Sequence, residues 1–162
     1  MPDKTPQLIT ENAHAAHVDP SVFTFRALQV TEAMAFGEGA RTCVSVFGEV
    51  FQRVEAGSLN PRRICSARVE FRPNEPGEAH VGVFSFPEDM EVSPFMLAYV
   101  NVCQHNMQGL LDSLRTGTGI ELGFRADIDT HLSDLIVRES RMSPDKRGGA
   151  YTLRTVSVSV SR

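Results

Sequence analysis

The residues best suited to chemistry form a short acidic cluster. Three carboxylates and an imidazole lie within eight residues, at Asp127, Asp129, His131 and Asp134. Such a set could gather a hard cation or supply an acid and a base. The calcium-loop pattern fails, because Leu132 stands where its turn glycine belongs and Arg138 where its closing glutamate belongs. The competing interpretation is helix capping, since acidic side chains at a helix start satisfy free amide groups and interact favourably with the helix dipole.

Arginines follow one predicted strand and suggest a second kind of site, at Arg62, Arg63, Arg68 and Arg72. Three of them share one strand parity, so they could form a basic stripe for phosphate or RNA, with Phe84 and Phe86 on the next strand as stacking surfaces. The expected element order is also that of an RNA-recognition motif, although residues 79–86 lack its first basic residue and its stacking aromatics. The alternative is a solvated strand face on which Glu70 partly offsets the arginines.

Several familiar chemistries lack their motifs. The lysines are Lys4 and Lys146, so the sequence has no GxxxxGK phosphate loop and no plausible buried Schiff-base lysine. It also lacks GxSxG, HExxH, GxGxxG and paired ligands at zinc spacing. His80 and His105 could act as bases, but no nucleophile can be placed near them, which favours surface or cleft-wall roles. The sequence therefore predicts no catalytic residue and no cofactor.

Composition indicates an ordinary globular domain. The chain has 162 residues, of which 41% are hydrophobic and 22% charged, and this length fits one domain. A net charge of −4 argues against a wholly basic surface for nucleic acid or anionic lipid. No signal-peptide pattern opens the chain, and no run of apolar residues is long enough to span a membrane. Cys43, Cys65 and Cys103 are widely spaced, which favours reduced, packed thiols and a cytoplasmic location without membrane contact.

The spacing of apolar residues predicts the elements. Residues 1–20, with three prolines, are expected to form a flexible arm before a single domain over 21–162. A strand is expected at 22–30, a helix from 31 to about 56, a strand hairpin at 62–72 and 79–86, and a helix at 94–115. A short strand at 120–124, a short helix at about 130–142 and a last strand at 151–161 complete the pattern. The inward face of the last strand switches near Arg154 and Thr155, which predicts a bulge there or a strand shared between two surfaces.

This order predicts an α+β fold, with a mainly antiparallel sheet of four or five strands and helices packed on one face. It is ferredoxin-like in its βαββαβ part and carries a C-terminal αβ extension. The valine–serine alternation of the last strand is typical of a sheet edge. We therefore expect a non-catalytic binding or assembly module that acts through a sheet face or edge and self-associates. The alternatives are a small-molecule-binding protein or enzyme using residues 127–134, and an RNA or phosphate binder using the Arg62–Arg72 strand.

Overall fold

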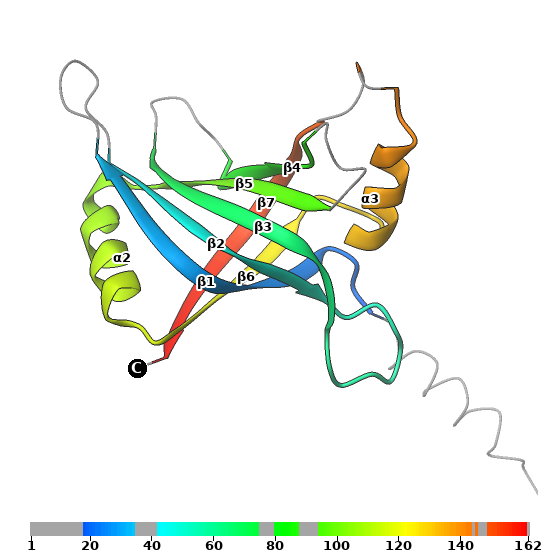
Figure 1. The fold of residues 1–162 in the computed structure, drawn as a ribbon, viewed down its shortest axis with the longest axis horizontal. Helices are drawn as coiled ribbons and strands as arrows, with labels where there is room; N and C mark the ends of the chain where they lie inside the picture. The colour runs from blue at the N-terminus through cyan, green and yellow to red at the C-terminus, as the bar shows by residue number, and fades with distance from the viewer. Residues whose placement is uncertain are drawn as a thin grey trace, which may run out of the picture.

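Seven strands form a closed barrel in the computed structural model, which describes residues 18–34, 42–74, 80–87, 94–143, 145 and 149–161 (Figure 1). Around the barrel the strand order is β1-β2-β3-β5-β4-β7-β6, and β1 also pairs with β6. The strands are β1 (Val22–Met34), β2 (Thr42–Gln52), β3 (Arg62–Pro73), β4 (Gly82–Ser85), β5 (Phe95–Val102), β6 (Gly119–Ala126) and β7 (Tyr151–Ser161). The expected ferredoxin-like α+β fold is therefore wrong, because the sheet closes on itself.

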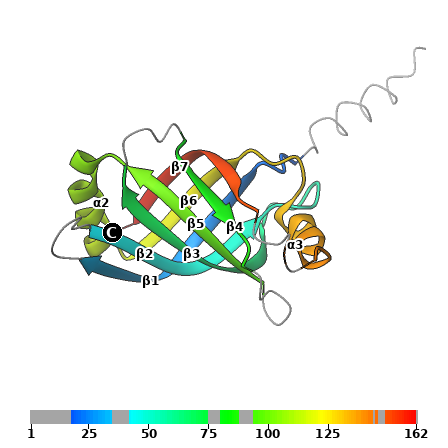
Figure 2. The ribbon, with the colours of Figure 1, turned by 90° about the horizontal axis from the view of Figure 1, so that it is seen from above.

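The two helices of the described residues lie at opposite ends of the barrel (Figures 1 and 2). Helix α2 (Gln104–Thr116) buries Met107, Leu111 and Leu114, and helix α3 (Leu132–Ser140) buries Leu132 and Leu135. Each helix thus covers the open end of a tube with its apolar stripe. The expectation of helices packed on one face of an open sheet is wrong for the same reason.

Aromatic side chains fill much of the barrel interior. Phe84 of β4 contacts three other rings, with ring centroids 5.6 Å from Phe23, 5.8 Å from Phe86 and 5.1 Å from Tyr151. Phe23 also stacks on Phe124 at 5.1 Å. These rings come from strands distant in sequence, so their packing favours closure of the barrel. Phe84 and Phe86 are buried and offer no stacking surface to an RNA, contrary to the sequence interpretation.

The helix expected from 31 to about 56 is two strands instead. β1 continues to Met34, and β2 runs antiparallel to it from Thr42. The expected apolar stripe included Val44, Phe47 and Phe51; Val44 is fully buried, whereas Phe47 is 37% exposed on the outer side. The predicted core positions Phe36 and Ala40 lie outside the described residues.

The expected hairpin of residues 62–72 and 79–86 is also wrong. β5 lies between β3 and β4, parallel to β3 and antiparallel to β4. Consequently the helix expected over 94–115 is a strand in its first part and becomes helical only at Gln104. The insertion of β5 between β3 and β4 depends on pairing between segments that are distant in the sequence. The local spacing of apolar residues carries no information about such pairing.

The C-terminal third follows the sequence expectation closely. β6, α3 and β7 lie where a strand, a short helix and a last strand were predicted. The predicted bulge is confirmed as well: Thr155 pairs with Arg125 and Leu153 pairs with Ala126, which leaves Arg154 as the extra residue. Residues 1–17 of the predicted arm lie outside the described residues.

Candidate functional site: an open strand edge and its crevice

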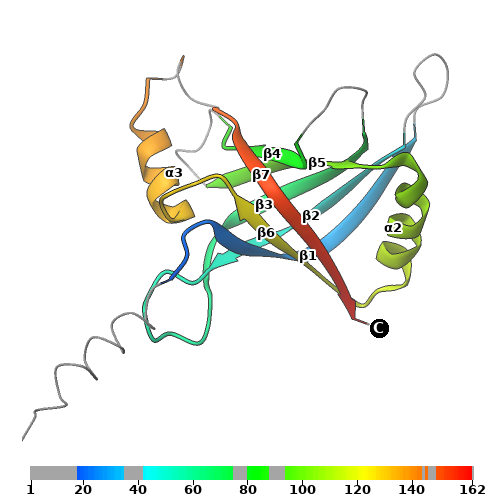
Figure 3. The ribbon, with the colours of Figure 1, turned by 180° about the vertical axis from the view of Figure 1, so that it is seen from behind.

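Most of β7 has a strand partner on one side only (Figure 3). It pairs with β6 from Leu153 to Ser161, whereas β4 pairs with it only from Tyr151 to Leu153. Within the described residues, no strand pairs with residues 154–161 on the side away from β6. Alternate residues of a strand direct their N–H and C=O groups to that side. We call residues 154–161 the β7 edge; it presents a row of main-chain donors and acceptors to an incoming strand.

An apolar crevice of about 340 Å³ borders the β7 edge. Val156 and Val158 form one wall, and Val100, Val102 and Leu110 of β5 and α2 contribute to the other. Val158 is 38% exposed although its cross-strand neighbour Leu122 is fully buried. The inward face of β7 is therefore left partly uncovered where β4 ends. An apolar hollow beside an unpaired strand edge can accept the side chains of an added strand.

Polar groups hold the rim of this crevice. The Asn101 side chain donates to the His80 carbonyl at 3.0 Å, and the Asn101 main-chain N–H donates to the Val81 carbonyl at 2.8 Å.

Cys103, expected to be a packed thiol, is exposed at the N-cap of α2. Cys65, in contrast, is buried, and desolvation raises the pKa of its thiol to about 12. His80 and His105 are both exposed, as the surface interpretation predicted.

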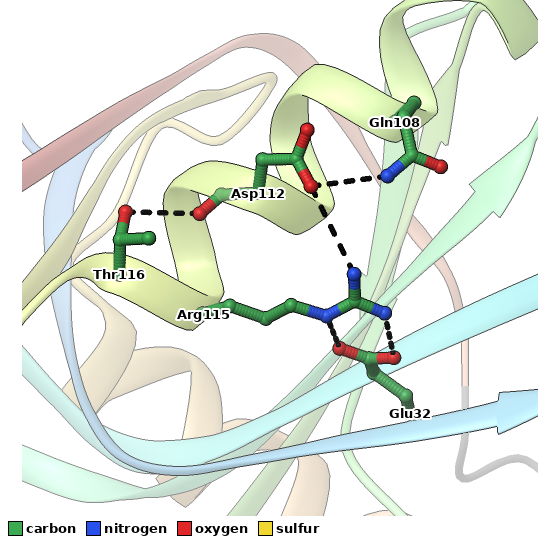
Figure 4. Close-up of polar contacts among 5 residues, drawn as sticks. All are labelled: Glu32, Gln108, Asp112, Arg115 and Thr116. Atoms are coloured by element: carbon green, nitrogen blue, oxygen red, sulfur yellow. Dashed lines mark hydrogen bonds and ion pairs between the residues drawn. The ribbon is translucent and has the colours of Figure 1, made fainter.

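Helix α2 is anchored firmly beside the edge. The Arg115 guanidinium donates two hydrogen bonds of 2.6 Å to the Glu32 carboxylate on β1 and lies 3.8 Å from Asp112 (Figure 4). These contacts raise the pKa of Arg115 and lower that of Glu32. At the end of α2, Gly117 approaches Val160 so closely that a Cβ would lie 2.1 Å from the valine methyl group. The crevice walls are thus held by packing and by a bidentate ion pair.

The structure places the acidic cluster around the start of α3. Asp127 is exposed and 2.8 Å from Arg154, and Asp129 and Asp134 are also exposed. His131 is the N-cap residue of α3 without a side-chain capping bond, and its Nδ1 is buried without a hydrogen-bond partner. In the part of the chain that the structure describes, no group of three His, Cys, Asp or Glu side chains could hold a metal ion. Use of this cluster by a ligand stays a prediction.

The predicted arginine stripe is largely paired. Arg68 and Arg72 lie 3.4 Å and 2.9 Å from Glu70, and the Arg72 guanidinium lies 3.8 Å from the centroid of the Tyr99 ring. Arg63 lies 2.8 Å from Glu49, while Arg62 is exposed. The alternative interpretation, in which Glu70 offsets the arginines, agrees with these contacts. Phosphate binding by this strand stays a prediction.

No family model matches the chain, and comparison with curated proteins and with solved structures gave no match. None of the helices in the described ranges is long and apolar enough to cross a lipid bilayer. The class is therefore defined by fold and site alone: a small β-barrel closed at both ends by helices, with an open edge along its last strand.

Proposed function

We propose that this protein is a non-catalytic assembly module that self-associates by pairing the β7 edge of one copy with that of another. The observation that carries the proposal is the lack of a strand partner for residues 154–161 on one side within the described chain, next to an apolar crevice. Main-chain groups would supply the hydrogen bonds of the joined sheet, and the valines would supply the buried apolar area.

The composition of the β7 edge favours a second copy as the partner. Edge strands usually carry charges or prolines that prevent pairing with another chain. Residues 155–161 carry neither, and Arg154 lies at the bulge, bonded to Asp127. When two such strands pair antiparallel about a two-fold axis centred on Val158, valine faces valine and serine faces serine. The two crevices then face one another across the joined sheet.

A reducing compartment suits this module. The three cysteines are unpaired, and Cys103 is exposed. Disulfides form readily in oxidising compartments and rarely in the cytosol. We therefore place the assembly in the cytoplasm.

Mass measurement across a concentration series tests the proposal. We expect size-exclusion chromatography with light scattering to give a dimer at micromolar concentration for the natural chain and a monomer for Val158→Lys. The substitution sets two ammonium groups opposite each other across the axis, and like charges directly opposite each other destabilise strand pairing. The far-ultraviolet circular dichroism spectrum should remain unchanged, because Val158 is 38% exposed.

Val22→Lys is the matched control. Val22 lies on β1, is 39% exposed and is not among the residues lining the crevice. This variant should remain dimeric. A natural chain that is monomeric at high concentration, or a Val22→Lys variant that dissociates as Val158→Lys does, would contradict pairing through the β7 edge.

A further inference from the structure

A larger hollow lies along the first residues of β1. Its volume is about 580 Å³. Its walls come from β1 and the residues just before it, from the end of β2 and the β2–β3 connection, and from β6. The apolar part of the lining comprises Val18, Val22, Phe23, Phe51 and Pro61. This volume lies within the range of small-molecule sites, which combine an apolar lining with a few convergent polar groups. None of these residues lines the crevice beside the β7 edge.

Three arginines line the same hollow, namely Arg26, Arg53 and Arg125. Two carboxylates, Asp19 and Glu121, also line it, so the charged groups among the described lining residues sum to one positive charge, in a chain whose net charge is −4. The hollow is thus a local positive region on an acidic protein. A concave positive region attracts anions, because field lines concentrate there.

The arginines are held loosely by the protein. Arg26 lies 3.5 Å from Glu121 and Arg125 lies 3.8 Å from Asp19, and all four side chains are about half exposed. Exposed ion pairs of this length contribute little, about 0–1 kcal/mol. Arg53 is exposed and has no ion pair or side-chain hydrogen bond within the described part of the chain. A ligand anion can therefore bind these guanidinium groups without breaking a strong contact.

Arg26 also joins the charged and the apolar parts of the hollow. Its guanidinium carbon lies 4.6 Å from the centroid of the Phe51 ring. A guanidinium stacked on a ring keeps the N–H groups at its edge free for a carboxylate or a phosphate. The hollow therefore offers an anion-binding edge directly beside an aromatic surface.

We propose that this hollow binds a small organic anion with an apolar body. The carboxylate or phosphate group would contact Arg26, Arg53 and Arg125, and the body would lie on Phe51 and Pro61. These arginines differ from the strand arginines singled out in the sequence, two of which are paired with Glu70. The sequence pattern gave no sign of them, because they lie on β1, after β2 and on β6 and meet only when the barrel closes.

Calorimetric titration with a charged and an uncharged probe of the same shape tests the proposal. We expect 2-naphthoate and 2-naphthyl phosphate to bind at least about tenfold more tightly than 2-naphthamide, because a charge-assisted bidentate hydrogen bond is stronger than a neutral one. Arg53→Gln should weaken naphthoate binding about three- to tenfold and leave amide binding unchanged. The two anionic probes together identify which head group the site prefers.

Arg141→Gln is the matched control. Arg141 is exposed and follows α3, and its replacement changes the net charge by the same amount as Arg53→Gln does. It should bind naphthoate as the natural chain does, and so should Val158→Lys, which alters only the β7 edge. The proposal is overturned by equal affinity for the acid and the amide, by equal effects of Arg53→Gln and Arg141→Gln, or by no binding of either anion at millimolar concentration.

Discussion

At the scale of single residues, Gln52 joins three segments of the chain. Its Nε2 donates to the Pro20 carbonyl at 2.8 Å and to the Val22 carbonyl at 3.1 Å. Its Oε1 accepts from the Leu132 main-chain N–H at 2.7 Å, which serves the free amide group at the start of α3. The side chain is 1% exposed, so no solvent replaces these bonds. A buried glutamine is indistinguishable from a surface glutamine in the sequence, and for this reason the sequence pattern assigned the cap of α3 to acidic residues.

Gln52→Leu tests this role. The substitution leaves the Leu132 N–H buried without its partner and removes the donor shared by two part-buried carbonyl groups. An unsatisfied buried group costs about 1–3 kcal/mol. We expect the free energy of unfolding, measured with urea, to fall by about 2–4 kcal/mol. Gln108→Leu is the control, because Gln108 is exposed on α2 and bonds only Asp112 among the contacts described for its side chain. A loss below about 0.5 kcal/mol in Gln52→Leu would place the cap elsewhere.

At the scale of elements, β2 shows why the sequence pattern predicted a helix where the structure has a strand. Its inward positions are Val44, Val46, Gly48, Val50 and Gln52, all buried. Gly48 is required there, because a Cβ would lie 2.0 Å from the Arg26 carbonyl oxygen. A glycine and a glutamine on the inner face, with Phe47 on the outer face, remove the two-residue alternation that marks a strand. The remaining apolar residues recur every three or four positions, as in a helix.

The candidate site was predictable in one half only. The β7 edge was visible in the sequence, since the valine–serine alternation and the face switch near Arg154 both appear in the structure. The opposite wall of the crevice was not visible in the sequence. Phe95–Val102 carries apolar residues on both faces, and its pattern continues directly into the apolar stripe of α2. Leu97 and Tyr99 lie outward and half buried, while Met96 and Ala98 fill the barrel. A strand covered on both sides cannot be distinguished from a buried helix by spacing alone.

The Glu32–Arg115 ion pair joins α2 to β1, and the pH dependence of its contribution to stability can be predicted. A hydrogen bond from Arg115 holds the pKa of Glu32 below its ordinary value of 4.5. A carboxyl group with a lowered pKa stabilises the fold above its unfolded pKa, and that contribution is lost as the pH falls through the folded pKa. Glu32→Gln should therefore lower the midpoint of urea unfolding at pH 7, and the difference from the natural chain should shrink as the pH falls below 4.5.

The control for this pair is Glu121→Gln, which removes a half-exposed partner 3.5 Å from Arg26. It should change the unfolding midpoint less than Glu32→Gln does at pH 7, because a longer exposed pair contributes less. If Glu32→Gln lowers the midpoint of urea unfolding by the same amount at pH 7 and at pH 3, loss of the carboxylate charge is not the cause of the lower stability.

At the scale of the whole molecule, closure of the barrel depends on its shortest strand. β4 has four residues and pairs with β5 on one side and β7 on the other. Four residues supply few main-chain hydrogen bonds, so side-chain packing must help to hold β5 and β7 together on either side of β4. Phe84 performs this role, because its ring contacts Phe23 of β1 and Tyr151 of β7.

Phe84→Ala should therefore act on the entire fold. Removing a buried phenylalanine costs about 3–5 kcal/mol through lost transfer free energy and the cavity that remains. We expect thermal and urea unfolding of the variant to remain single transitions, identical by circular dichroism and tyrosine fluorescence, because the rings around Phe84 belong to strands on both sides of the closure. Phe47→Ala, at an outward position that is 37% exposed, should cost about 1 kcal/mol or less. If Phe84→Ala instead unfolded in two steps, with β7 released first, the packing around Phe84 would not unite the barrel into one cooperative unit, and the rigid edge that the proposed self-association requires would be lost with β7.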